Sequence, residues 1–295
     1  MIDRIIDARR RDLGDGFVVG RVLPAPFRRT VGPFIFFDHM GPATYAPGAG
    51  FDVRPHPHIG LSTVTWLFEG EIMHRDSLGF VQPITPGAVN WMTAGRGIVH
   101  SERSSDATRA SGQTLHGIQA WIALPEGAEE VEPGFWHHPA DMLPSITFDG
   151  AKRTLIAGSA FHATAPAATH SPLFYIDVDA EPGARVQLPD DHAERALYVA
   201  EGAIELDGIR YDAGKMLVLT PGAPVHFITP GRARVMLLGG APIGERHIFW
   251  NLVSSRPERI EQAKRDWAEG RFAMVPGETD FIPLPEEPKA PEPMS

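Results

Sequence analysis

Cysteine is absent from the 295-residue sequence. Disulfides, thiolate nucleophiles, iron–sulfur clusters and cysteine zinc sites are therefore excluded. Long apolar runs are also missing, since stretches such as Met216–Leu219 are far too short to span a bilayer. The N-terminal residues carry charge but no apolar core or cleavage site, so we expect no signal peptide. These absences predict a protein that does not bind membranes, with the cytoplasm as its default location.

Basic residues are outnumbered by acidic ones, 27 against 37, which gives a formal net charge of −10. An acidic surface repels phosphate backbones, and no run of Lys or Arg forms a basic patch. We therefore expect no direct binding to nucleic acid. Any effect on DNA would have to pass through a protein partner.

Turn-forming residues are frequent, with 30 glycines and 28 prolines. They separate short segments rich in β-branched and aromatic residues, a pattern typical of many short strands. One block of predicted strands runs from Phe17 to about Leu124 and a second from about Leu173 to Leu238. The residues between them are rich in Pro, Ala and His and are interpreted as a connection.

The two blocks share a sequence pattern. The segment LFEGEI at 67–72 matches YVAEGAIEL at 198–206, and ITPGAVNW at 84–91 resembles LTPGAPVHF at 219–227. This pattern predicts an internal duplication of one barrel-like unit.

One helix is clearly indicated near the C-terminus. Ser255 and Glu258 have the spacing of a capping box, and Pro257 suits the first turn. Apolar residues then recur at helical spacing, and Gly270 supplies an end signal.

Potential metal ligands occur as two pairs. His56 and His58 form the first pair, and His100 and Glu102 form the second. Because residues i and i+2 of a strand point to the same face, each pair projects its side chains together. Two such pairs on neighbouring strands would place three imidazoles and one carboxylate in one cavity.

This ligand chemistry suits iron, zinc, copper or nickel, whereas calcium and magnesium prefer oxygen ligands. Four protein ligands on an octahedral ion leave two open positions, enough for a substrate and dioxygen. A tetrahedral zinc bound by all four would be closed and structural.

Other histidines and carboxylates offer weaker candidates. A second site could involve His192, Glu194 and His226, although we expect these to be solvated loop residues. His74 is interpreted as an exposed histidine and His39 as a core histidine with its hydrogen bonds satisfied.

Several longer segments carry a family resemblance. They are Arg29–Phe34, Phe37–Pro42, Arg54–Gly60, His74–Gly79, Asn90–Glu102, Phe249–Asn251 and the helix around Arg259–Trp267. Gly50, His56, His58 and Gly70 have the spacing of the first cupin motif. Together the segments resemble the pirin family, over about residues 20–285. Many pirins have Glu at the position of Ser62, so the sequence departs from the family there.

The resemblance implies an all-β fold of two cupin-type β-barrels, a bicupin, with a short C-terminal helix. The expected domains are an N-terminal metal-binding barrel over 1–130 and a connection over 131–170. A C-terminal barrel with the helix would cover 171–285, without a metal, and a Pro-rich tail 286–295. The family implies iron as Fe(2+) bound by His56, His58, His100 and Glu102; zinc, nickel, manganese and copper are alternatives.

The resemblance also implies a function. Some pirins resemble quercetin 2,3-dioxygenases, so the expected substrates are a small flavonol-like aromatic molecule and O2, with Glu102 as the catalytic base. The alternative is a redox-sensitive, metal-dependent regulator that binds a transcription factor or a metabolic enzyme without turnover. A third possibility is a zinc-dependent isomerase or hydrolase, because cupins host many chemistries.

Overall fold

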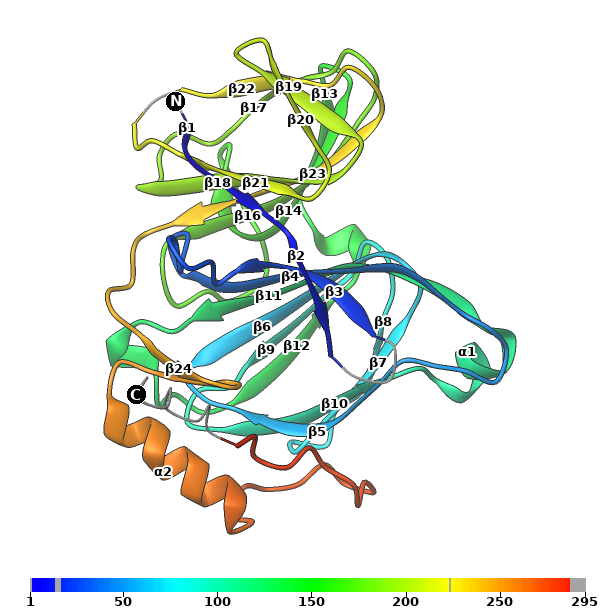
Figure 1. The fold of residues 1–295 in the computed structure, drawn as a ribbon, viewed down its shortest axis with the longest axis vertical. Helices are drawn as coiled ribbons and strands as arrows, with labels where there is room; N and C mark the ends of the chain where they lie inside the picture. The colour runs from blue at the N-terminus through cyan, green and yellow to red at the C-terminus, as the bar shows by residue number, and fades with distance from the viewer. Residues whose placement is uncertain (1, 14–16, 223, 287–295) are drawn as a thin grey trace, which may run out of the picture.

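The computed structural model describes residues 2–13, 17–222 and 224–286, which form two β-barrels stacked along the long axis of the molecule (Figure 1). The strands of the first barrel are β2 (Arg9–Asp12), β3 (Val18–Leu23), β4 (Phe34–Tyr45), β5 (Asp52–His58), β6 (Leu61–Glu69), β7 (Ile72–Asp76), β8 (Val81–Ile84), β9 (Val89–Thr93), β10 (Ile98–Arg103), β11 (Gln113–Ala123) and β12 (Gly134–His138). A seven-stranded sheet in the order β12-β9-β6-β11-β4-β3-β2 is closed by a four-stranded sheet in the order β5-β10-β7-β8. The two ligand pairs predicted from the sequence therefore lie on the adjacent strands β5 and β10.

The second barrel repeats this arrangement. Its strands are β1 (Ile2–Asp7), β13 (Ser145–Phe148), β14 (Ala151–Ala160), β15 (Ala163–Thr164), β16 (Leu173–Ala180), β17 (Arg185–Gln187), β18 (Glu194–Glu201), β19 (Ala203–Leu206), β20 (Ile209–Asp212), β21 (Lys215–Leu219), β22 (His226–Ile228) and β23 (Ala233–Gly240). The order β21-β18-β23-β16 corresponds to β9-β6-β11-β4, and β17-β22-β19-β20 corresponds to β5-β10-β7-β8. The bicupin architecture expected from the sequence is confirmed.

The duplication is real, but one of its two sequence matches is wrong. Segments 67–72 and 198–206 lie on the equivalent hairpins β6–β7 and β18–β19. Segment 84–91 joins β8 to β9, whereas 219–227 joins β21 to β22, one strand further along the barrel. The shared Thr-Pro-Gly is a turn signal that suits any of these connections, so it does not mark an equivalent position.

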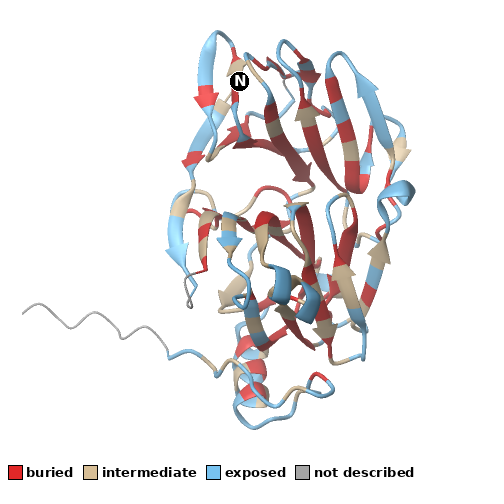
Figure 2. Ribbon diagram, turned by 90° about the vertical axis from the view of Figure 1, so that its right-hand side faces the viewer, coloured by how far each residue is buried: buried red, intermediate tan, exposed pale blue. Residues whose placement is uncertain are grey.

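The barrels share a continuous apolar core at their junction. Phe34, Phe37 and Trp66 of the first barrel are fully buried in one cluster with Tyr175 and Tyr198 of the second. Figure 2 shows the buried positions running along the strands of both barrels. The strand β1 adds to this connection, because it pairs with β21 in the second barrel although it lies within the range 1–130 expected for the first.

The C-terminal helix α2 (Pro257–Ala268) packs against the first barrel, beneath β5 and β10 (Figure 1). It follows a hairpin of β24 (His247–Phe249) and β25 (Leu252–Ser254). Ile260 lies in one apolar cluster with Ile59, and Trp267 in another with Val99. Although the domain ranges expected from the sequence grouped this helix with the second barrel, its apolar face covers the sheet that carries the histidines.

The predicted capping box of α2 is wrong. The N-cap residue is Arg256, and it makes no side-chain capping bond. The backbone N–H of Ser255 donates to Glu129 Oε1 at 2.8 Å and its hydroxyl donates to Glu129 Oε2 at 3.0 Å. A buried carboxylate from the first barrel therefore takes the donors of Ser255. Pro257 does occupy the first turn, and Gly270 has the positive φ of 68° suited to a helix end.

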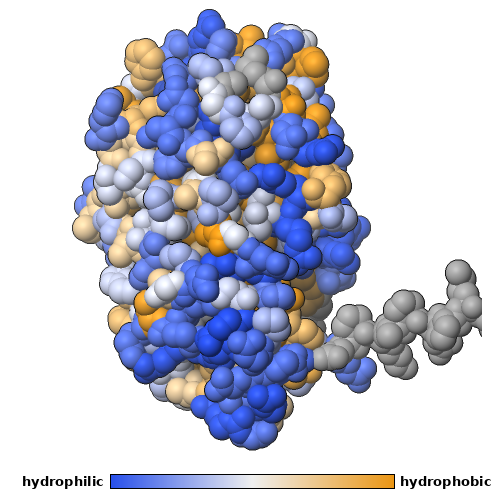
Figure 3. All heavy atoms as spheres, turned by 90° about the vertical axis from the view of Figure 1, so that its left-hand side faces the viewer, coloured by the Kyte–Doolittle hydropathy of each residue, from blue (hydrophilic) through white to orange (hydrophobic). Residues whose placement is uncertain are grey.

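The remaining helical segments are short and were not expected from the sequence: α1 (Asp106–Ser111) and the 3-10 turns η1 (Glu126–Ala128) and η2 (Ala140–Met142). None of the described helices is long and apolar enough to cross a membrane. The face drawn in Figure 3 is largely hydrophilic, with small separate apolar patches, as the composition indicates.

Candidate metal centre

The pairing of β5 with β10 brings the histidines together. The strands run antiparallel, His100 lies opposite His56, and Ile98 lies opposite His58. The i and i+2 residues of each strand share a face, so both pairs of ligands are directed toward the barrel interior. The sequence prediction of two facing pairs is correct for the three histidines.

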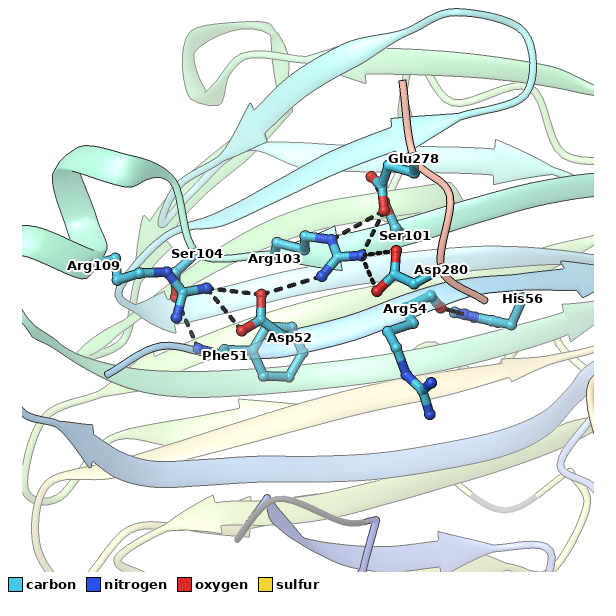
Figure 4. Close-up of polar contacts among 10 residues, drawn as sticks. All are labelled: Phe51, Asp52, Arg54, His56, Ser101, Arg103, Ser104, Arg109, Glu278 and Asp280. Atoms are coloured by element: carbon cyan, nitrogen blue, oxygen red, sulfur yellow. Dashed lines mark hydrogen bonds and ion pairs between the residues drawn. The ribbon is translucent and has the colours of Figure 1, made fainter. Parts of the chain in front are cut away.

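Three imidazoles converge at the floor of the first barrel. One nitrogen atom from each of His56, His58 and His100 lies within 4.8 Å of the others. The Nε2 atoms of His58 and His100 are 3.1 Å apart, and all three side chains are buried. His56 donates from Nδ1 to the carbonyl of Arg54 at 2.8 Å, which leaves its Nε2 lone pair available (Figure 4). Such a cluster of nitrogen lone pairs fits a transition-metal ion.

Burial keeps these imidazoles neutral. Desolvation lowers the pKa of His56 to about 4 and holds the pKa values of His58 and His100 well below the ordinary value. Each histidine also disfavours a second positive charge beside it. Neutral imidazole is the form that binds metal, so the site is in the ligating state at neutral pH.

Glu102 lines the same cavity as the histidines but is not part of the close group of three. The register of β10 with β5 shifts between His100 and Glu102, so the strict i, i+2 geometry is interrupted there. Its Oε1 lies 3.4 Å from the hydroxyl of Thr65, and burial raises the pKa of the carboxyl group to about 7. Its place as the fourth ligand therefore stays a prediction.

His74 lies beside His100 inside the first barrel and is not the exposed histidine expected from the sequence. It is only 4 % exposed, with its ring stacked on Phe135 at 4.2 Å. Its Nδ1 lies 3.4 Å from Nδ1 of His100, and its Nε2 lies 2.9 Å from Oδ2 of Asp76. The expectation failed because β7 pairs with β10 in the small sheet, which places His74 opposite Glu102 and inside the barrel.

The carboxylate of Asp76 is itself held in place. Its Oδ1 accepts hydrogen bonds from the backbone N–H groups of Leu78 and Phe80 at 2.9 and 3.1 Å. Asp76 is fully buried. The motif His74–Gly79 therefore forms a turn that fixes a carboxylate behind a histidine, an arrangement common around metal-binding imidazoles.

A cavity of about 410 Å³ opens above the histidines. Phe36 and Trp121 stack face to face in its wall with ring centroids 3.9 Å apart, and the Trp121 ring meets His58 edge-on at 5.2 Å. Arg21 covers the outer face of Phe36 at 4.5 Å. A volume of this size and an aromatic wall suit a planar small molecule. The sequence contained no signal for this wall, because Phe36 and Trp121 come from different strands, β4 and β11.

Ser62, where many pirins have Glu, does not contact Glu102 in any recorded hydrogen bond. Its hydroxyl pairs with that of Thr93 on the neighbouring strand β9 at 2.9 Å. The residue that approaches Glu102 is instead Thr65, three positions further along β6. The departure at Ser62 therefore leaves the three-histidine group intact.

A cluster of ion pairs connects the ends of strands β5 and β10 (Figure 4). Arg103, the last residue of β10, contacts Asp52 of β5 at 3.6 Å and Glu278 at 2.6 Å. It also reaches Asp280 at 2.9 Å, while Asp52 receives a second guanidinium, that of Arg109, at 2.7 Å. The cluster ties β5 and β10 to each other and to the C-terminal segment.

The C-terminal segment then reaches the cavity itself. The N–H of Ile282 donates to the carbonyl of Pro55 at 2.8 Å, and the carbonyl of Ile282 accepts from the indole of Trp267 at 3.0 Å. Ile282 also lines the cavity. A segment more than 200 residues from β5 in the sequence thus forms part of the site, which local patterns could not show.

The weaker candidates of the second barrel do not come together. Glu194 accepts from the N–H of Gly32 at 2.6 Å and pairs with Arg28 at 2.9 Å, so it links the two barrels. His192 contacts the carbonyl of Ser159. Among the described residues, the three-histidine group of the first barrel is the one cluster with metal-ligand spacing.

The strands that correspond to β5 and β10 carry apolar residues inside the second barrel. Val186 of β17 and Phe227 of β22 are buried in its core. His226, the neighbour of Phe227, is exposed and lies 2.8 Å from the guanidinium of Arg185. The second barrel is therefore filled with apolar side chains where the first has its three histidines. His39, by contrast, is a core histidine as expected, bonded to Tyr198 at 2.8 Å.

Comparisons with known proteins agree with this geometry. The pirin family profile matches residues 16–122, and that of the pirin C-terminal cupin domain matches residues 175–273. A "Pirin-like protein" of Caulobacter vibrioides is 53 % identical over 97 % of this chain and 100 % of its own. A Pseudomonas aeruginosa protein named "Putative quercetin 2,3-dioxygenase" is 42 % identical over 90 % of this chain and 83 % of its own.

A solved structure shares the whole fold. The crystal structure of a quercetin 2,3-dioxygenase from Acinetobacter baumannii superposes with a TM-score of 0.90 and 34 % sequence identity, covering 97 % of this chain and 96 % of the other. The match spans both barrels. From the two family profiles, these relatives and the repeated barrel topology, the chain belongs to the pirin family.

Proposed function

We propose that this pirin is a metal-dependent dioxygenase of the quercetin 2,3-dioxygenase type, with one ion held by His56, His58, His100 and Glu102. The observation that carries the proposal is the convergence of three buried, neutral imidazoles at the floor of a cavity with an aromatic wall. The relatives named for this activity support it.

The donor set fits a transition metal of the borderline class. Three imidazoles and one carboxylate suit iron, and zinc, nickel, manganese or copper are the alternatives. When bound, iron would supply Lewis acidity toward a substrate hydroxyl and redox chemistry with dioxygen. Glu102 would complete the set from the cavity wall, where it already lies beside the histidines.

The chain itself would position the flavonol and move its proton. The rings of Phe36 and Trp121 form an aromatic part of the cavity wall against which a flavonol can pack. Glu102 would accept the proton of the 3-hydroxyl group, because its carboxylate lines the cavity beside the three histidines, within reach of a hydroxyl that faces them. Ring opening would then consume one O2 and release carbon monoxide.

The test uses anaerobically purified protein reconstituted with iron. Quercetin and oxygen are added, and the loss of flavonol absorbance is followed together with carbon monoxide release. We expect turnover by the wild type and none by His56→Ala, which loses a ligand. Glu102→Ala should lose activity; full activity with iron retained would overturn its assignment as the base.

Absence of turnover with iron demonstrably bound would overturn the enzymatic proposal. The redox-sensitive regulator would then be favoured. Binding of a protein partner that differs between the ferrous and ferric forms would be the observation to seek.

A further inference from the structure

Arg54 differs from the other arginines near the metal centre. It lies on β5 two residues before His56, it is exposed to solvent, and it is among the residues that line the cavity. Among the described residues, its side chain has one hydrogen-bond partner, the carbonyl of Phe281, at 3.2 Å. No carboxylate of the described residues lies within 4 Å of its guanidinium, which Figure 4 shows turned away from the cluster around Arg103.

The neighbouring cations are all neutralised. Arg21, also in the cavity wall, is paired with Asp38 at 2.7 Å. Arg103 is paired with several carboxylates, and Arg109 is paired with Asp52. Arg54 is therefore the cavity-lining arginine whose charge is not compensated within the described residues, in a protein with a formal net charge of −10.

The position of Arg54 relative to the metal ligands is fixed by its backbone. Its carbonyl accepts the Nδ1–H of His56, so its main chain and the ligand ring move together. Two residues along a strand span roughly 7 Å. The backbone of Arg54 is therefore held close to the histidines, and Arg54 lines the same cavity as they do.

We propose that Arg54 is a specificity-determining residue that selects aromatic substrates with an anionic group, a carboxylate or an ionised phenolate, remote from the hydroxyl that faces the metal. The inference rests on the proposed function, because it assumes an aromatic substrate in this cavity. A planar guanidinium binds a carboxylate through two parallel hydrogen bonds, and such charge-assisted bonds are the strong ones. The aromatic wall would hold the rings and Arg54 would set their direction.

The test compares two ligands that differ in charge and by one methyl group. We would use 6-hydroxy-2-naphthoate and its methyl ester with zinc-loaded protein, because zinc does not turn over redox chemistry. Affinities are measured by isothermal titration calorimetry at pH 7.5. We expect the wild type to bind the carboxylate about tenfold more tightly than the ester, as one charge-assisted hydrogen-bonded pair implies.

Variants assign that preference to the side chain. Arg54→Gln should lose about tenfold in affinity for the carboxylate and none for the ester, while Arg54→Lys should keep part of the preference as a point charge. Arg210→Gln removes an exposed charge on the second barrel and should change neither affinity. Zinc content is measured for each variant and should be retained, since His56 contacts the backbone of Arg54 rather than its side chain.

The outcomes separate the two proposals. Equal binding of carboxylate and ester by the wild type, or an undiminished preference in Arg54→Gln, would overturn the role of Arg54 and leave the proposed function standing. Failure of both ligands to bind zinc-loaded wild type would overturn the aromatic substrate site itself, and the Arg54 proposal with it.

Discussion

His74 and His100 face each other through their Nδ1 atoms, 3.4 Å apart inside the first barrel. If His100 directs Nε2 toward the metal, its Nδ1 carries the proton and His74 accepts it. His74 must then carry its own proton on Nε2, where Asp76 accepts it at 2.9 Å. One consistent set of tautomers therefore runs from the carboxylate to the proposed metal ligand.

We expect this arrangement to set the affinity for the metal. Asp76→Asn and His74→Phe should each weaken metal binding about ten- to hundredfold, the usual effect of removing such an outer partner. Competition against a chelator measures the affinity, with the exposed His226→Asn as the control. Unchanged affinity in a folded Asp76→Asn protein would show that the contact has no such role.

The stacked pair of Phe36 and Trp121 provides a second prediction. Phe36→Leu removes the ring that stacks on Trp121 in the cavity wall, an aromatic contact worth about 1 kcal/mol, while keeping apolar volume. The KM for quercetin should therefore rise about fivefold, with kcat little changed. Steady-state kinetics measures both, and Phe148→Leu, at an exposed ring of the second barrel, is the matched control. A fall in kcat alone would mean that the ring serves the chemical step instead of binding.

The ion pairs of Arg103 lead to a third prediction, which concerns the opening of the C-terminal segment. Arg103→Met removes the ion pairs that tie β10 to Glu278 and Asp280. Partly exposed pairs in a network contribute on the order of 1 kcal/mol, so the C-terminal segment should open about fivefold more often. Hydrogen exchange of the Ile282 N–H, which bonds to Pro55, reports this opening. Identical exchange in the variant would show that apolar packing alone holds the segment.

The fourth prediction concerns the free energy of unfolding at mildly acidic pH, to which His39 contributes. Burial lowers the pKa of His39 to about 4, whereas an unfolded histidine titrates near 6.5. Between these values the unfolded chain binds more protons, so the free energy of unfolding falls as the pH drops from about 6.5 to about 4. Above pH 6.5 none of this free energy of unfolding is lost. The loss between pH 6.5 and pH 4 amounts to on the order of 3 kcal/mol.

His39→Gln should flatten this pH dependence, although it also lowers stability by disturbing the bond to Tyr198. Urea unfolding of both proteins at pH 5 and pH 7.5 measures the change. The other histidines are common to both proteins, so the difference in slope reports His39 together with its neighbour His116, whose Nε2 lies 2.7 Å from Nε2 of His39. Parallel pH profiles would show that another group dominates the acid sensitivity.

The sequence alone was sufficient to predict that the three histidines meet and to predict the class of fold. His56 and His58 share a face of β5 because the side chains of a strand alternate, and this period of two holds wherever the strand pairs. Turn residues between short apolar segments likewise indicated many short strands, and the repeated sequence pattern indicated two barrel-like units. These features depend on local stereochemistry, which is the same in the isolated segment and in the folded chain.

Tertiary structure decided which polar groups meet across the barrels. His74 was read as exposed because nothing local marks a histidine that another strand will cover. Ser255 has the spacing of a cap, yet Glu129, far away in the sequence, takes its hydrogen bonds. The free charge of Arg54 is visible only once Arg103 and its partners are placed. Such contacts depend on the pairing of distant strands and on which groups are desolvated, and both are set when the whole chain packs.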